Sequence, residues 1–148
     1  MLSKLFEWFK AEAETPSSAP RVHLAAAVLM VEVTMADHKI EPEEEQMLRQ
    51  RFRESLKLSD AEVEKLMAEA LIEQEETLDL YQYTRVINDA FGALEKFELM
   101  VDLWLIGFAD GHVDRYEDSM VRKVADLLYV SHSDFMMAKQ EARKRLGL

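Results

Sequence analysis

The chain has 148 residues, a length typical of one domain, and 49% of them are hydrophobic, which is enough to build a core. Its formal net charge of −11 excludes a nucleic-acid partner from our expectations, because phosphate binding needs a basic surface. Cysteine is absent, which excludes disulfides, thiolate metal sites and a cysteine nucleophile.

The composition also favours helix over strand. Glycine and proline are few, whereas alanine, leucine, glutamate and lysine are common. No apolar stretch approaches the roughly 20 residues that cross a bilayer. No secretory signal is visible, because Lys4, Glu7 and Lys10 interrupt the apolar character of the first residues. We therefore expect an all-α, soluble, cytoplasmic protein.

Residues 1–14 have the pattern of a separate amphipathic helix. Its apolar face carries Leu2, Leu5, Phe6, Trp8 and Phe9. Residues 15–21 contain two prolines and two serines, so we predict a linker there. We expect the apolar face to dock on the domain or on a second subunit. Weak contact with a membrane surface is the alternative, since Trp and Phe favour that interface.

Residues 22–148 are predicted to form one domain of about seven helices. The helices predicted over residues 22–36 and 97–109 are apolar on nearly all sides, which indicates burial. We expect the densest contacts of the domain between these two helices. Each is followed by an acidic loop and then by an amphipathic helix. A further helix over about residues 79–92 is expected to bridge the two halves.

The two acidic loops are copies of one motif. Residues 36–44 read ADHKIEPEE and residues 109–117 read ADGHVDRYE, at a constant offset of 73 positions. The shared pattern is Ala-Asp-x-x-[Ile/Val]-[Glu/Asp]-x-x-Glu. Internal repetition of this kind predicts two related helix–loop–helix halves packed together. It also directs the search for function to these loops.

One interpretation of the repeated acids is purely structural. Asp114 can be the N-cap of the next helix with Glu117 at N3, which is a capping box. In the first copy Pro42 suits N1 and Glu44 suits N3. The residue that ends the preceding helix should adopt a left-handed conformation, which is Gly111 in the second copy and His38 in the first.

The other interpretation is a metal site. Asp37 and Asp110 each follow a buried helix, where a negative charge opposes the helix dipole by about 0.3–1 kcal/mol. Each needs a partner, which is either a backbone N–H group or a cation. If the two halves pack with their loops together, Asp37, Glu44, Asp110 and Glu117 converge. Such oxygen ligands suit Ca²⁺, Mg²⁺ or Mn²⁺, although the pattern is not that of a calcium-binding EF-hand loop.

At these residues the chain resembles the TerB-like domain of the tellurite-resistance proteins. The resemblance extends over about residues 22–148 and implies an all-α fold with two related halves. It also implies a metal site at the motif acids, here Asp37, Glu44, Asp110 and Glu117, and an association with tellurite and stress resistance. The chain departs from the motif at His38, where the family prefers glycine.

We therefore expect a non-catalytic TerB-like module that binds a divalent cation and a protein partner or a second copy of itself. The alternative is a structural protein–protein adaptor without metal, whose acids only cap helices. A metal-assisted hydrolase is the third reading, but no phosphate loop or nucleophile motif supports an enzyme. His38 and His112 could add nitrogen ligands, although exposed loop histidines are the simpler interpretation.

Overall fold

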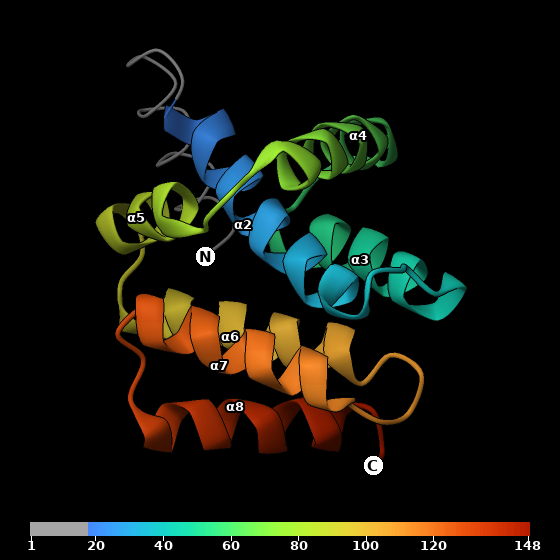
Figure 1. Cartoon of the computed structure of the whole chain (residues 1–148), viewed down its shortest axis with the longest axis vertical. Coiled ribbons are helices and arrows are strands. Elements are labelled where there is room, and N and C mark those ends of the chain that lie inside the picture. The colour runs from blue at the N-terminus through green and yellow to red at the C-terminus, as the bar shows by residue number, and fades with distance from the viewer. Residues whose placement is uncertain (1–17) are drawn as a thin grey trace.

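The protein is all-α, as predicted. The computed structural model describes residues 18–148, which form seven α-helices and one short 3-10 helix, and no strand occurs among these residues (Figure 1). The amphipathic helix predicted over residues 1–14 lies outside the described residues. No helix of the described part is long and apolar enough to cross a membrane.

The helices follow one another with short connections. In chain order they are α2 (Ser18–Thr34), η1 (Met35–Asp37), α3 (Pro42–Ser55), α4 (Asp60–Glu76), α5 (Tyr81–Ala90), α6 (Ala93–Gly107), α7 (Arg115–Leu127) and α8 (His132–Arg145). α2 begins inside the segment that we predicted as a linker, residues 15–21. Pro20 therefore lies in the first turn, where a missing N–H group costs no helical hydrogen bond.

The repeat seen in the sequence extends to the backbone of the turns. His38 and Gly111 occupy equivalent positions, and both have positive φ, 71° and 101°. Lys57 and Tyr129 follow α3 and α7, and their φ angles are 59° and 58°. Because non-glycine residues seldom adopt such angles, the matching pairs show that the two halves share one turn geometry. α2, α3 and α4 thus correspond to α6, α7 and α8.

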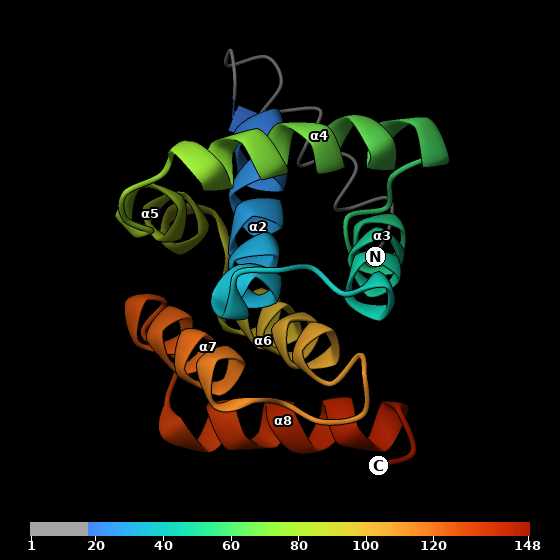
Figure 2. The same ribbon diagram turned by 45° about the vertical axis from the view of Figure 1, so that its right-hand side comes forward.

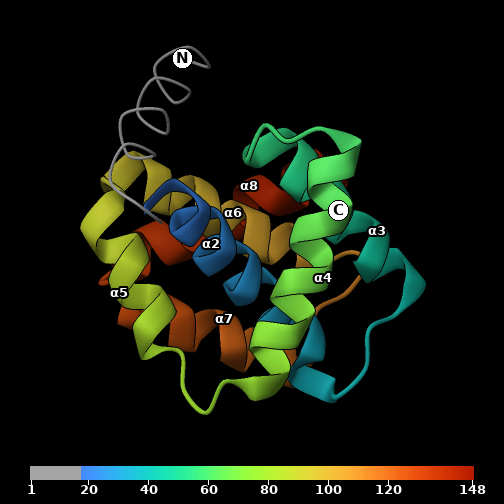
Figure 3. The same cartoon turned by 90° about the horizontal axis from the view of Figure 1, so that it is seen from above.

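α2 lies at the centre of the first half. Figure 2 shows it upright between α3 and α5, with α4 crossing in front and α6, α7 and α8 below. Seen from above, it lies between α4 and α5 (Figure 3). It contacts α3, α4, α5, α6 and α7, and residues from Ala25 to Val31 are all almost fully buried. The uniformly apolar sequence of this helix is explained by neighbours on every side.

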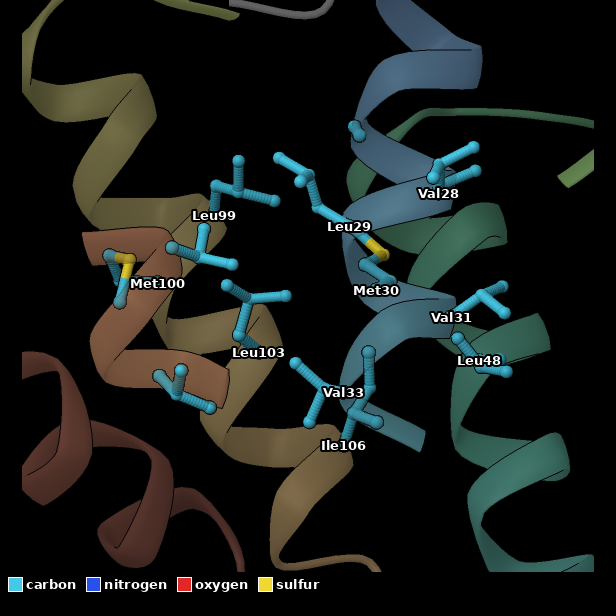
Figure 4. Packing of buried hydrophobic residues seen from close by; sticks show 14 of the residues in the cluster. Val28, Leu29, Met30, Val31, Val33, Leu48, Leu99, Met100, Leu103 and Ile106 are labelled. Carbon is cyan, nitrogen blue, oxygen red and sulfur yellow. The ribbon is translucent and has the colours of Figure 1, made fainter. Parts of the chain in front are cut away.

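The prediction that α2 and α6 make the densest contacts is wrong. The two helices do pack together, and Figure 4 shows Leu29 and Val33 of α2 pointing toward α6. However, α2 packs more extensively on α4 and α5, and α6 packs more extensively on α8. In that second contact the rings of Trp104 and Phe135 lie 5.2 Å apart, edge to face. An all-round apolar helix must be covered on every side, and the largest part of that cover comes from the equivalent helix of the same half, α4 for α2 and α8 for α6.

α5 bridges the halves, as predicted. It packs against α2 of the first half and α7 of the second. Asn88 donates a hydrogen bond from Nδ2 to the carbonyl oxygen of Leu127, at 2.9 Å. This contact ties the last turn of α7 to the helix that joins the two halves.

Candidate functional site

The fold brings the two acidic loops together. η1, at the end of α2, packs against α7, so the first loop lies beside the start of the helix that follows the second loop. Asp37, Glu44, Asp110 and Glu117, all predicted as site residues, line one open cavity of about 540 Å³. The other residues around this acidic cavity are Lys39, Glu41, Glu43, Ala109, Gly111, His112 and Asp114.

Glu44 and Glu117 are the two buried carboxyls of the site, with 3% and 4% of their surface exposed. Each occupies position N3 of its helix and accepts a hydrogen bond at Oε1 from the N-cap backbone. The Glu41 N–H donates to Glu44 at 3.0 Å, and the Asp114 N–H donates to Glu117 at 3.1 Å. The capping role predicted for both residues is therefore present, but it uses only one oxygen of each.

The second oxygens raise an electrostatic problem. Oε2 of Glu44 is buried, and no hydrogen bond reaches it while both carboxyls are ionised. Burial raises the pKa of both groups, and that of Glu117 reaches about 9 because its protonated form also donates a hydrogen bond to Glu44. At neutral pH the Glu117 carboxyl therefore keeps its proton, next to a second buried carboxyl that comes from the other half of the protein.

Asp37 and Asp110 lie nearer the mouth of the cavity. Each accepts a long hydrogen bond at Oδ1 from the backbone N–H two residues further on, which is Lys39 at 3.4 Å and His112 at 3.3 Å. These turns are the backbone alternative that we considered for the two aspartates. A single long bond leaves most of the acceptor capacity of each carboxylate unused.

Two nitrogen-bearing side chains lie at the rim, at equivalent positions of the repeat. The Lys39 ammonium is 3.2 Å from Oε1 of Glu41, and this contact raises the pKa of Lys39. His112 places Nδ1 3.8 Å from Oδ1 of Asp110. Sequence reasoning missed Lys39 and Glu41 as residues of the cavity, although the constant offset of the repeat pairs Lys39 with His112. His38 is exposed and does not line the cavity.

Comparison with known proteins now identifies the family. The family model described as "Tellurite resistance protein TerB" matches residues 23–140, which is more than half of the chain. The chain belongs to the TerB family. A search of curated proteins and a search of solved structures found no match.

The TerB match includes both acidic loops and all four predicted acids. Their chemistry fits a hard cation, because the donors are carboxylates and one buried carboxylate oxygen has no other partner once the pair is ionised. As they stand, however, no three or more His, Asp or Glu side chains within residues 18–148 are grouped closely enough to hold a metal ion.

The TerB domain contains a second buried charged group, away from the acidic cavity. Asp102 of α6 accepts a hydrogen bond from the Ser55 hydroxyl at 2.9 Å and lies 3.4 Å from the Arg51 guanidinium. Burial raises the pKa of Asp102 to about 6, despite these two contacts. The pair links α3 of the first half to α6 of the second.

Proposed function

We propose that this TerB domain is a non-catalytic module that binds a divalent cation between its two acidic loops. The ligands are Asp37, Glu44, Asp110 and Glu117, and the cation is Ca²⁺, Mg²⁺ or Mn²⁺. The bound cation supplies positive charge that draws the four carboxylates of the two halves together.

One observation carries this proposal. Two carboxyls from different halves are buried within hydrogen-bonding reach of each other, and Oε2 of Glu44 is buried without a hydrogen-bond partner. Two buried carboxylates repel each other strongly unless a proton or a cation lies between them. A divalent cation can replace that proton, while Asp37 and Asp110 at the mouth add further oxygen ligands.

The setting of this activity is also a proposal. The family name supports a role in tellurite and stress resistance. A cation-binding module without a catalytic site acts through a partner, which we take to be another protein or a second copy of the chain in the cytoplasm. The apolar side chains of residues 1–14 supply a contact surface for such a partner, and weak membrane contact through Trp8 and Phe9 is the alternative.

A structural adaptor without metal is the second candidate. It is favoured by the capping hydrogen bonds, because Oε1 of both Glu44 and Glu117 has a partner that needs no ligand. In that reading the protonated pair is the functional state, and the loops serve only to join the halves.

Thermal melting separates the two candidates. We expect each binding cation to stabilise the wild type by about 2.7 kcal/mol at a hundredfold excess over its Kd. Asp110→Asn should lose that gain, and it should be neutral or slightly stabilising in chelator because it removes one of the clustered negative charges. Asp89→Asn, on the exposed side of α5, is the matched control and should keep the full gain. If the cations change the melting temperatures of the wild type, Asp110→Asn and Asp89→Asn by the same amount, or not at all, Asp110 binds no cation and helix capping remains the explanation of the repeated acids.

A further inference from the structure

The two halves of the acidic cavity are equivalent in backbone but not in chemistry. Lys39 and His112 occupy the same position of the repeat, and each donates its backbone N–H to the aspartate two residues before it. One half therefore presents a permanent cation at the rim and the other presents an imidazole. A cation that enters the cavity meets these two groups before it reaches the buried carboxyls.

Lys39 disfavours cation binding in the first half. Its ammonium already pairs with Glu41, and it lies close enough to Asp37 to interact with that charge as well. It partly neutralises the carboxylates beside it and repels any other cation from them. Because the lysine is exposed, water and salt weaken this repulsion without changing its sign.

His112 has the opposite effect in the second half. Its Nδ1 lies 3.8 Å from Oδ1 of Asp110. Two donor atoms that bind one transition-metal ion at a tetrahedral angle lie about 3.4 Å apart. The imidazole and the carboxylate are therefore close to the separation needed to bind one ion together. The ring is 77% exposed, so it can turn toward the cavity without breaking the packing of the core.

An independent feature of the cavity also indicates a ligand. Glu44 is almost fully buried, and its Oε2 atom has no hydrogen-bond partner among the residues that the structure describes. A cation held near Asp110 and His112 would be in the same cavity as this oxygen.

We propose that His112 determines the selectivity of the site: it adds a nitrogen ligand beside Asp110, so the cation binds toward the second half and transition-metal ions are preferred to Ca²⁺ and Mg²⁺. This inference rests on the proposed cation site and refines it. Imidazole is a good ligand for Zn²⁺ and for other transition metals, whereas Ca²⁺ and Mg²⁺ bind oxygen almost exclusively. Lys39 is the matching residue that keeps the first half from competing.

Calorimetry with four chloride salts, of Mn²⁺, Zn²⁺, Ca²⁺ and Mg²⁺, tests the proposal at about pH 8, where free imidazole is neutral. His112→Gln should weaken Zn²⁺ binding by at least about tenfold and change Ca²⁺ and Mg²⁺ binding by less than about twofold. The effect on Mn²⁺, which favours oxygen ligands but also accepts imidazole, should lie between these two. Lys39→Gln should tighten all four cations by a similar factor, because it removes a charge and no ligand. His132→Gln, an exposed histidine of α8 outside the cavity, should change nothing.

A spectroscopic measurement accompanies the affinities. Substoichiometric Mn²⁺ should broaden the NMR signals of the His112 ring before those of His132, because paramagnetic broadening falls steeply with distance. If His112→Gln leaves the ratio of Zn²⁺ to Ca²⁺ affinity unchanged, the selectivity proposal is overturned while the cation site stands. If the wild type binds none of the four cations, the cation site itself is overturned and the selectivity proposal with it.

Discussion

Replacing Glu117 by glutamine tests the electrostatics of the buried pair without any metal. Glu117 of the wild type keeps its proton up to a high pH, because burial and the hydrogen bond to Glu44 raise its pKa from 4.5 to about 9. Glutamine has nearly the same shape and stays neutral at every pH. Its amide NH₂ can donate to Oε2 of Glu44, and its carbonyl can still accept the Asp114 N–H.

The expected effect follows from proton linkage. A carboxyl whose pKa is raised by folding binds a proton in the folded state that the unfolded state has lost. Its contribution to stability is complete below the unfolded pKa and is lost as the pH rises toward the folded pKa, here from 4.5 to about 9. Within that window the free energy of unfolding falls by about 1.4 kcal/mol per pH unit, or roughly 2–3 kcal/mol between about pH 6 and about pH 8.

Glu117→Gln should remove most of this slope. The variant and the wild type should be similarly stable near the ordinary pKa of glutamate, and the variant should become the more stable protein as the pH rises. At about pH 8, which is about 3.5 units above the ordinary pKa, the difference should reach about 4–5 kcal/mol. Urea unfolding in chelator, repeated across this pH range, measures the free energy of unfolding of each protein directly.

The matched control is Glu95→Gln. Glu95 also occupies N3 of its helix and accepts the N–H of the N-cap, Gly92, at 2.9 Å. It is exposed and has no buried carboxyl beside it, so the same exchange should leave the pH profile of the wild type unchanged. Parallel profiles for the wild type and Glu117→Gln would refute the shared proton, and with it the argument that the pair needs a cation.

Two further substitutions test other parts of the structure. Asp102→Asn should not destabilise the protein, because burial already raises the pKa of Asp102 from 3.8 to about 6. In urea unfolding, the stability of the variant relative to the wild type should rise between these two pH values, by up to about 3 kcal/mol. A variant less stable than the wild type above about pH 6 would show that the pairing of Asp102 with Arg51 outweighs the cost of its burial. His38→Gly should stabilise the protein by about 0.5–1 kcal/mol in a thermal melt, because glycine adopts the φ of 71° without steric strain, and a lower Tm would contradict that reasoning.

The repeat made the location of the site predictable. Because both motifs follow buried helices at one constant offset, any packing that placed the loops together would bring all four acids into one cavity, as observed. Capping by Asp114, with Glu117 at N3, followed from residue type and spacing alone. Local rules of this kind depend only on neighbours in the chain.

The division of roles among the acids was not predictable. A repeat shows which residues correspond, but it does not show which side chains the other half covers. Glu44 and Glu117 are buried because η1 packs against α7, and that packing depends on residues far apart in the chain. For the same reason the sequence could not rank the neighbours of α2, since a helix that is apolar on every side has no preferred face.

The different residues at positions 39 and 112 have a consequence for the evolution of such a domain. If a single half assembled as a symmetric dimer, both copies would carry the same side chain at this position, and any substitution would appear twice. Covalent joining of the halves removes that constraint. Lysine and histidine at the two equivalent positions are a combination that a symmetric dimer of identical halves cannot have. Duplication would thus allow affinity and selectivity to change separately, one loop at a time.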